Sequence, residues 1–172
     1  MVKLKLVATA GLAVVLAGCG GAEQAPPVEK AASALSAGLY ELSSEVTELA
    51  STDGSTPAVT LKKGDKSVIK ACVAADNKPA PELLAEVEGD KCEIKNSYIR
   101  NGRMSAQMSC VRAGKNGPVM PAMIGSFTAD SFEGEVSSLT YFPDDGDYRM
   151  TRKISAKRVG ACPAAPAETK PA

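Results

Sequence analysis

Residues 101–110 read Asn101-Gly102-Arg103-Met104-Ser105-Ala106-Gln107-Met108-Ser109-Cys110. After the Asn-Gly pair, apolar and polar side chains alternate strictly. An apolar residue at every second position is typical of a β-strand with one buried face. An Asn-Gly pair in front of such a strand is typical of a hairpin turn. The stretch therefore predicts an antiparallel hairpin, and the same pattern of turn and alternating strand can be looked for in the rest of the chain.

The preceding strand sets the register of this hairpin, because Cys92, Ile94 and Tyr98 share one of its faces. A two-residue loop would pair Tyr98 with Ser105 and mix buried with exposed faces. A three-residue loop over 100–102 pairs Tyr98 with Met104 and Ile94 with Met108, and it keeps the faces matched. We therefore predict the three-residue loop. That register also places Cys92 opposite Cys110, within reach of a cross-strand disulfide.

Two further hairpins follow from the same matching of faces. The first turns near 128–131, where Phe127 faces Phe132 and Met123 faces Val136. The second turns at the Asp- and Gly-rich residues 144–146. The pairs predicted across it are Phe142 with Tyr148, Thr140 with Met150, and Val136 with Ile154. The strands at about 120–129, 132–142 and 148–157 then form a meander.

Residues 39–47 and 66–73 supply two earlier strands, and residues 80–87 a helix with Pro near its start and Gly89 after its end. The fold class that follows is mainly β. We expect a curved antiparallel sheet or half-barrel of about seven strands, with one short helix and two disulfides. The helix is expected to cover an open end or one face of the sheet. Four methionines, Met104, Met108, Met123 and Met150, are expected to fill the core rather than bind Cu(I).

The amino-terminal residues have the pattern of an export signal. Lys3 and Lys5 precede an apolar run over 6–17, which is too short to span a bilayer comfortably. The run ends in Leu16-Ala17-Gly18-Cys19, which closely resembles the lipobox of bacterial lipoproteins. The resemblance implies cleavage before Cys19 and lipid on its sulfur and its new amino terminus. Lipid on Cys19 would anchor the protein stably to a membrane.

The predicted organisation has four parts: a lipoprotein signal peptide at 1–18, a flexible tether at 19–37, a β domain at 38–162 and a disordered tail at 163–172. Cleavage leaves 154 of the 172 residues, enough for one buried core. The predicted location is the bacterial cell envelope, with the domain facing the periplasm. Gly20 rather than Asp after Cys19 resembles lipoproteins sent to the outer membrane.

Five cysteines and no histidine are present. With Cys19 assigned to lipid, four remain, and an even number in an exported chain indicates two disulfides. Zinc binding is disfavoured because the close Cys-x-x-Cys pairs of zinc sites are missing. The hairpin register pairs Cys92 with Cys110 and leaves Cys72 for Cys162.

The composition excludes several classes of function. Without histidine, Ser-His-Asp and Cys-His catalytic arrangements cannot be built. A net charge of +0 gives no footprint for nucleic acid. Arg100, Arg103, Arg149 and Arg152 form a candidate anion-binding patch; the alternative is a solvated outer face or surface pairs with neighbouring glutamates. We expect no cofactor and no metal site.

Several segments together resemble a known family: Gly38-Leu39-Tyr40-Glu41, Ile69-Lys70-Ala71-Cys72-Val73, Gly89-Asp90-Lys91-Cys92, Asn101-Gly102 with Cys110, and Arg158-Val159-Gly160-Ala161-Cys162. The family is a bacterial envelope family catalogued as domain of unknown function number three-six-one-seven. Many members have Trp where this chain has Tyr40. The resemblance implies a secreted or lipid-anchored β domain and carries over no catalytic residues.

The expected role is a non-catalytic binding or envelope-maintenance module. Its partners would be the membrane, through Cys19, and an envelope protein or an apolar small molecule. The alternatives are a periplasmic inhibitor of an envelope-attacking enzyme, a hydrolase that works without histidine, and a structural spacer. A hollow apolar interior would favour small-molecule binding, converging carboxylates in a pocket would favour hydrolysis, and a solid core without a pocket would favour the spacer.

Overall fold

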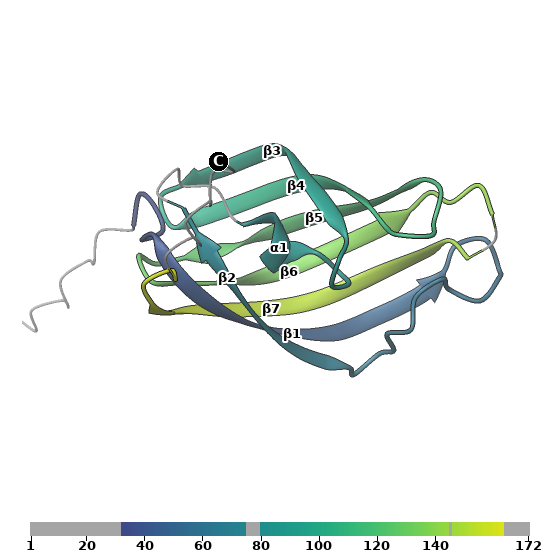
Figure 1. Ribbon diagram of the computed structural model, residues 1–172, viewed down its shortest axis with the longest axis horizontal. Helices are drawn as coiled ribbons and strands as arrows, with labels where there is room; N and C mark the ends of the chain where they lie inside the picture. The colour runs from purple at the N-terminus through teal and green to yellow at the C-terminus, as the bar shows by residue number, and fades with distance from the viewer. Residues whose placement is uncertain (1–31, 75–79, 145, 164–172) are drawn as a thin grey trace, which may run out of the picture.

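The computed structural model of the chain describes residues 32–74, 80–144 and 146–163. It contains one four-residue helix, α1 (Pro81–Leu84), and seven strands. The strands are β1 (Gly38–Ser51), β2 (Lys66–Val73), β3 (Lys91–Arg100), β4 (Arg103–Val111), β5 (Pro118–Phe127), β6 (Ser131–Thr140) and β7 (Tyr148–Gly160). They form one antiparallel sheet in the order β2-β1-β7-β6-β5-β4-β3 (Figure 1).

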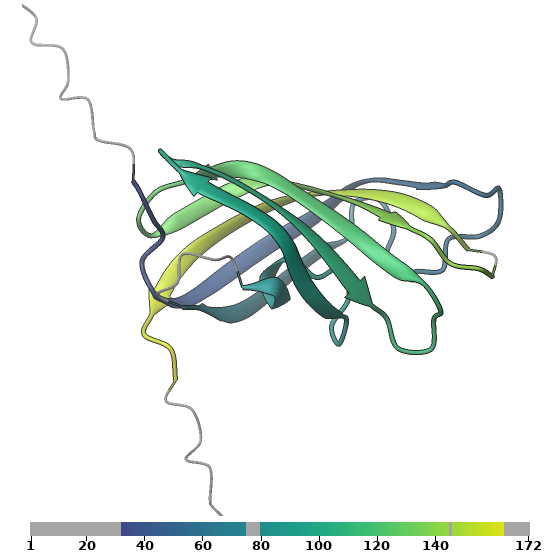
Figure 2. The ribbon, with the colours of Figure 1, turned by 90° about the horizontal axis from the view of Figure 1, so that it is seen from above.

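The sheet is curled into a half-barrel, and α1 lies on its concave side (Figure 2). Because side chains alternate along each strand, one set points into the curve and the other points out. The inward set is apolar and almost fully buried; its largest members are Tyr40, Leu42, Met108, Met123, Phe132, Tyr148 and Met150. The four methionines predicted to be core residues are all among the buried side chains. The predicted fold class is confirmed.

The hairpin of β3 and β4 shows the predicted disulfide but not the predicted turn. Arg100 pairs with Arg103, so the loop has two residues, and Asn101 and Gly102 both have positive φ, 52° and 71°. This is the turn that matches the right-handed twist of a hairpin. The three-residue loop was therefore the wrong choice, and Tyr98 faces Ser105 instead of Met104.

A β-bulge in β3 explains why the disulfide was nevertheless predicted correctly. The register shifts by one residue between Ile94 and Asn96, so Ile94 still pairs with Met108 and Cys92 with Cys110. A bulge moves every side chain after it to the opposite face. Tyr98, predicted on the buried face, is consequently 54% exposed, while Ile99 packs against the core. The shorter loop and the bulge each shift the strand pairing by one residue relative to the prediction, and the two shifts cancel at the cysteines.

The next two hairpins differ in how well they were predicted. Between β5 and β6, Phe127 pairs with Phe132 and Met123 with Val136, as predicted. Between β6 and β7 the predicted register is wrong by two residues, since Val136 pairs with Arg152. Met150 pairs with Ser138 rather than with Thr140, and Ile154 pairs with Gly134 rather than with Val136.

A polar loop sets the β6–β7 register. One carboxylate oxygen of Asp147 accepts hydrogen bonds from the Thr140 hydroxyl and the Phe142 backbone N–H. Asp53, from the loop after β1, accepts from the backbone N–H groups of Gly146 and Asp147. The connection is therefore longer than a tight turn at 144–146. Because a shift of two residues preserves the faces, Met150 and Ile154 are still buried.

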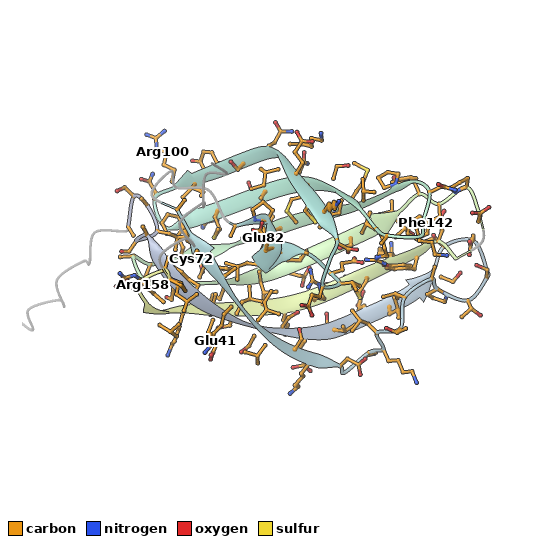
Figure 3. The ribbon with its side chains drawn as sticks, viewed as in Figure 1. Glu41, Cys72, Glu82, Arg100, Phe142 and Arg158 are labelled. Atoms are coloured by element: carbon orange, nitrogen blue, oxygen red, sulfur yellow. A yellow bond between two sulfur atoms is a disulfide. The ribbon has the colours of Figure 1, made fainter. Side chains whose placement is uncertain are left out.

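Helix α1 is shorter than the predicted span of 80–87. It ends because Ala85 has extended backbone angles, φ −56° and ψ 146°. Leu83 and Leu84 are fully buried and join the core. α1 contacts both β2 and β3, the two edge strands of the sheet, so it bridges the open side of the half-barrel. Glu82 marks its position in Figure 3.

Both predicted disulfides are present, with Cα–Cα distances of 5.6 Å for Cys72–Cys162 and 4.0 Å for Cys92–Cys110. The folded part begins earlier than the predicted boundary at residue 38. Leu35 is buried in the core, and the Ser36 N–H donates to the Ala129 carbonyl. The last residues of the predicted tether therefore belong to the domain. The signal peptide and Cys19 lie outside the described residues, and so does the tail after residue 163.

Candidate functional site

The concave side of the sheet holds a buried ionic cluster centred on Arg112, the residue that follows β4. Its guanidinium donates to both carboxylate oxygens of Asp90, from Nε at 2.9 Å and from Nη2 at 2.8 Å. Nη2 also donates to Glu86 Oε2 at 2.9 Å, and Nη1 donates to the Tyr148 hydroxyl at 2.6 Å. The carboxylate side chains are 0% (Glu86) and 2% (Asp90) exposed. One arginine thus pairs with two buried carboxylates.

Tyr148 completes this cluster from β7. Its hydroxyl donates to Glu86 Oε2 at 2.6 Å. Burial, and then the nearby Glu86 carboxylate, raise the pKa of the Tyr148 phenol well above its usual value. Burial alone would lower the pKa of Arg112, but its hydrogen bonds to Asp90, Tyr148 and Glu86 outweigh burial and raise it. Tyr148 therefore stays neutral and Arg112 stays charged throughout the physiological pH range.

Arg152 lies next to the cluster on the inner face of β7. Its Nη1 donates to the Ala85 carbonyl at 2.9 Å and its Nη2 to the Leu84 carbonyl at 2.6 Å. The residue is 4% exposed. Burial lowers the pKa of Arg152, and the carboxylate of Glu86 opposes that effect. Arg152 thus binds carbonyls at the end of α1, as cations do at helix C-termini.

Together these contacts fasten residues 80–90, which we call the strap, across the concave side. Arg112 reaches it from the end of β4, and Tyr148 and Arg152 both reach it from β7. Buried ion pairs of this kind are costly to break from one side. Glu86 and Asp90 do converge, but both are bound to Arg112 rather than facing an open cavity.

The outer face carries a hollow of about 1030 Å³, which we call the trough. It crosses the strands from β2 to β4, a distance of about 24 Å at ~4.8 Å per strand. Its outward-facing lining residues are Ser43, Glu45, Lys66, Val68, Arg103, Ile124, Ser126, Glu133, Glu135, Lys153 and Ser155.

Charges of opposite sign alternate along the trough. Glu45 pairs across strands with Lys66 on one side and Lys153 on the other, and Lys153 pairs in turn with Glu135. Of these, only Lys66 and Glu45 come within ion-pair distance, with Lys66 Nζ 3.4 Å from Glu45 Oε2. Among the described residues, Lys153 and Glu135 have no ion-pair partner, and neither do Arg103 and Glu133. The trough therefore offers free cations and free carboxylates, separated by short serines.

The structure does not assemble the predicted anion patch. Arg100 and Arg103 pair at the tip of the β3–β4 hairpin. Successive cross-strand pairs connect Arg103 with Ser126 of β5, then with Glu133 of β6, and then with Ser155 of β7, so Arg103 lies level with Ser155 in the sheet. Arg149 lies six residues before Ser155 on β7, or about 20 Å along the strand. Arg152 points inward and is buried, so it is not part of any outer surface. Figure 3 shows Arg100 at one end of the molecule and Phe142, near the start of β7, at the other.

Neither Arg112 nor its partners Glu86, Asp90 and Tyr148 were identified from the sequence as members of a buried cluster, and Arg152 was placed in the outer patch. The alternation itself contained the necessary information. Arg112 continues the inward positions that run from Met104 to Cys110, and Arg152 has the same parity as Met150. A charged residue at an inward position needs a buried partner. The identity of that partner depends on the strap, which is distant in sequence.

The fold and the two polar sites define a class: a disulfide-stapled antiparallel half-barrel closed by a short strap. The chain belongs to the family described as "Protein of unknown function (DUF3617)", whose model matches residues 35–162. The family resemblance drawn from the cysteine framework is thereby confirmed. No curated protein and no solved structure matches the chain.

Within residues 32–74, 80–144 and 146–163, no helix has the length and apolar character needed to cross a membrane. In the same ranges, His, Cys, Asp and Glu side chains do not gather in groups of three or more that could hold a metal ion.

Proposed function

We propose that this protein is a non-catalytic binding module of the bacterial cell envelope, held to a membrane through lipid on Cys19. The observation that carries the proposal is the trough, a hollow of about 1030 Å³ across six strands that is lined by both charged and apolar groups. Its partner would be an envelope protein that presents an extended polar segment to this surface. A module of this kind that binds an envelope-attacking enzyme would act as its periplasmic inhibitor.

The chemistry of the trough supports a protein partner. Three cations (Lys66, Arg103 and Lys153) face three carboxylates (Glu45, Glu133 and Glu135), so the surface has no net charge to attract a polyanion. None of its lining residues is aromatic. Exposed Val68 and Ile124, at 61% and 65%, add apolar contact area at its two sides. A polypeptide, with both charges and backbone hydrogen-bonding groups, matches this mixture.

A hydrolase without histidine is less well supported. The carboxylates that converge, Glu86 and Asp90, are buried and both bind Arg112. Paired acids in hydrolysis instead flank an accessible space for substrate and water. A spacer would also need no trough, whereas this chain keeps serines and unpaired charges along a hollow of its outer face.

The trough can be tested by filling it. In Ser155→Tyr, a phenol ring would project from β7 into the trough, and the matched control Ser137→Tyr places the same ring on an exposed position of β6 outside the trough. Both variants and the wild type are immobilised and exposed to envelope extract, and retained proteins are quantified by mass spectrometry. We expect at least one protein to be retained by wild type and Ser137→Tyr and lost from Ser155→Tyr. Identical profiles for all three would contradict the proposal.

The anchor requires a separate experiment. We expect Cys19→Ser to abolish metabolic labelling with a fatty acid and to release the protein from membranes on fractionation. A Cys19→Ser protein that is still labelled and membrane-bound would show that Cys19 is not the lipid attachment site. This result would leave the trough proposal standing, because it concerns a different part of the chain.

A further inference from the structure

The strap is a separately held piece of the fold. It lies between Cys72 and Cys92, each joined by a disulfide to another part of the sheet: Cys72 to Cys162, and Cys92 to Cys110. Both edges of the half-barrel are therefore covalently fixed at the points where the chain leaves for the strap and returns from it. Displacing the strap would break only its own contacts, because the sheet does not depend on it for strand pairing.

The strap presents two kinds of chemistry to the concave face, in sequence. Leu83 and Leu84 contribute fully buried apolar side chains, and Glu86 and Asp90 then contribute two carboxylates. The sheet presents the complement. Its apolar wall is rich in flexible methionines, which adapt to differently shaped ligands, and its cationic end is formed by Arg112 and Arg152. An apolar chain with an anionic head has the same order of groups as the strap.

The polar contacts beneath the strap are incomplete. Glu86 Oε1, Arg152 Nε and Ser138 Oγ are buried and have no hydrogen-bond partner among the described residues. They come from the strap, β7 and β6. Ser138 pairs with Met150, which lies on the inner face of β7 between Tyr148 and Arg152. Glu86 accepts a hydrogen bond from the Tyr148 hydroxyl, and the carbonyl of its neighbour Ala85 accepts one from Arg152. Two of the three, Arg152 Nε and Ser138 Oγ, are donors on the inner faces of neighbouring strands and are available to an additional anionic oxygen, while the unpaired acceptor Glu86 Oε1 would leave with the strap.

A way in exists beside α1. A hollow of about 590 Å³ separates the two edge strands there, lined on one side by Cys72 and Ala74, on the other by Cys92 and Ile94, and by Pro81 and Glu82 of α1. This is the open side of the half-barrel that α1 bridges. A ligand entering from this hollow would meet α1 first and the apolar concave wall behind it.

We propose that the concave face under the strap is a binding site for a single-chain anionic amphiphile, and that the strap occupies it as an internal substitute. The ligand's apolar chain replaces Leu83 and Leu84, and its head group replaces the carboxylates on Arg112. On exchange the carboxylates of Glu86 and Asp90 return to water, and the incoming head group keeps Arg112 paired with an anion. A buried ion pair is costly to break from one side only, and a ligand that supplies its own anion can displace the strap without leaving Arg112 as an uncompensated buried charge.

This site is independent of the trough and of its partner. The two lie on opposite faces of the sheet, and none of the residues that line the trough contacts Arg112 through a hydrogen bond or ion pair. Failure of one proposal therefore leaves the other unchanged.

The test is calorimetric titration of the whole chain after the predicted cleavage site, with Cys19→Ser so that no attached lipid competes. The probe is dodecanoate below its micelle concentration, with dodecanol as the neutral counterpart. Glu86→Gln removes a competing carboxylate and enlarges the open population, so we expect it to bind dodecanoate roughly tenfold more tightly than the parent chain. Glu88→Gln, at an exposed position of the same strap, is the matched control and is expected to bind as the parent does.

The decisive comparison is between Glu86→Gln and Arg112→Gln. Both remove the ion pair between these two residues, but only the second removes the proposed partner of the ligand's head group. We expect Arg112→Gln to bind dodecanoate at least about tenfold more weakly than Glu86→Gln. Equal affinities of the two variants, dodecanol binding as tight as dodecanoate binding, or no binding to parent and Glu86→Gln would each overturn the proposal.

Hydrogen exchange of the parent chain gives a readout that no variant can obscure by misfolding. If the ligand displaces the strap, the backbone amides of residues 83–87 should exchange faster when dodecanoate is bound, while those of β6 and β7 should not. Unchanged or slower exchange in the strap would overturn its role as a substitute. Repeating the titration with dodecyl phosphate separates fatty-acid from phosphate head groups; the tighter binder identifies the head group that the site prefers.

Discussion

The two faces of the same sheet use the same charged residue types in opposite ways. On the inner face, Arg112 makes four hydrogen bonds to three partners, and its carboxylate partners are almost inaccessible. On the outer face, Lys66 and Glu45 form an ion pair whose side chains are 73% and 47% exposed. The other trough charges have no ion-pair partner among the described residues. Arg149 and Arg152, three positions apart on β7, lie on different faces.

This difference separates structural charges from available ones. A buried charge must be paired, so the inner cluster determines where the strap lies. An exposed charge is already solvated, and a nearby opposite charge adds little. The outer charges are therefore free to contact a partner at small cost to the fold. The comparison predicts large losses of stability from inner substitutions and small ones from outer substitutions.

Arg112→Met should have the largest effect. It leaves Glu86 and Asp90 as buried, uncompensated carboxylates, so we expect the free energy of unfolding to fall by about 3–5 kcal/mol. Arg103→Met, on the exposed face of the same hairpin, should change it by less than about 0.5 kcal/mol. Urea unfolding of both variants, with disulfides intact, measures the two values. Similar losses in the two variants would remove the distinction between the faces.

Arg152→Met should have the next largest effect. The carbonyls of Leu84 and Ala85 lose their buried donor, which we expect to cost about 1–3 kcal/mol. The matched control is Arg149→Met on the same strand, with an expected change of less than about 0.5 kcal/mol. Thermal unfolding followed by circular dichroism would detect the difference. An equally large effect at Arg149 would mean that this outer charge is also structural.

Tyr148→Phe adds a pH dependence to the inner face. Losing hydrogen bonds to Glu86 and Arg112 should cost about 1–2 kcal/mol near neutral pH. Because the folded-state pKa of Tyr148 is raised, wild type has this group's stability in full below the unfolded pKa of about 10 and loses it as pH rises further. The gap between wild type and variant should therefore narrow in alkaline solution. A difference in unfolding free energy that widens with pH would contradict this prediction. Tyr40 also has a raised pKa, but it is present in both proteins, so its contribution cancels in the difference.

Lys66→Gln should have the smallest effect. It breaks the exposed pair with Glu45, and we expect the free energy of unfolding to change by less than about 0.5 kcal/mol, and by still less at high salt. Urea unfolding at two salt concentrations is sufficient to measure it. A loss as large as that of Arg152→Met would show that the trough charges support the fold and would weaken their assignment to binding.

The alternation of side chains allowed the strands and the buried faces to be predicted, because parity is a local property. It also paired the cysteines, through the chance cancellation of a loop of two residues and a bulge at β3. Neither feature has a marker in the sequence beyond Asn101-Gly102, which fits either loop length. The β6–β7 register was missed because Asp53, remote in sequence, binds the connection between these strands.

The sequence by itself therefore determined the fold class, the apolar core and the number of disulfides, since these depend on local periodicity or on counting cysteines, and it indicated the family through the resemblance of its cysteine-containing segments. Only the tertiary structure decided that Arg112 and Arg152 are buried while Arg103 and Arg149 are exposed, and that the strap supplies the partners of the buried pair. The physical reason is that burial of a charge depends on what lies opposite it. In this chain those partners come from segments tens of residues apart, brought together only when the half-barrel closes.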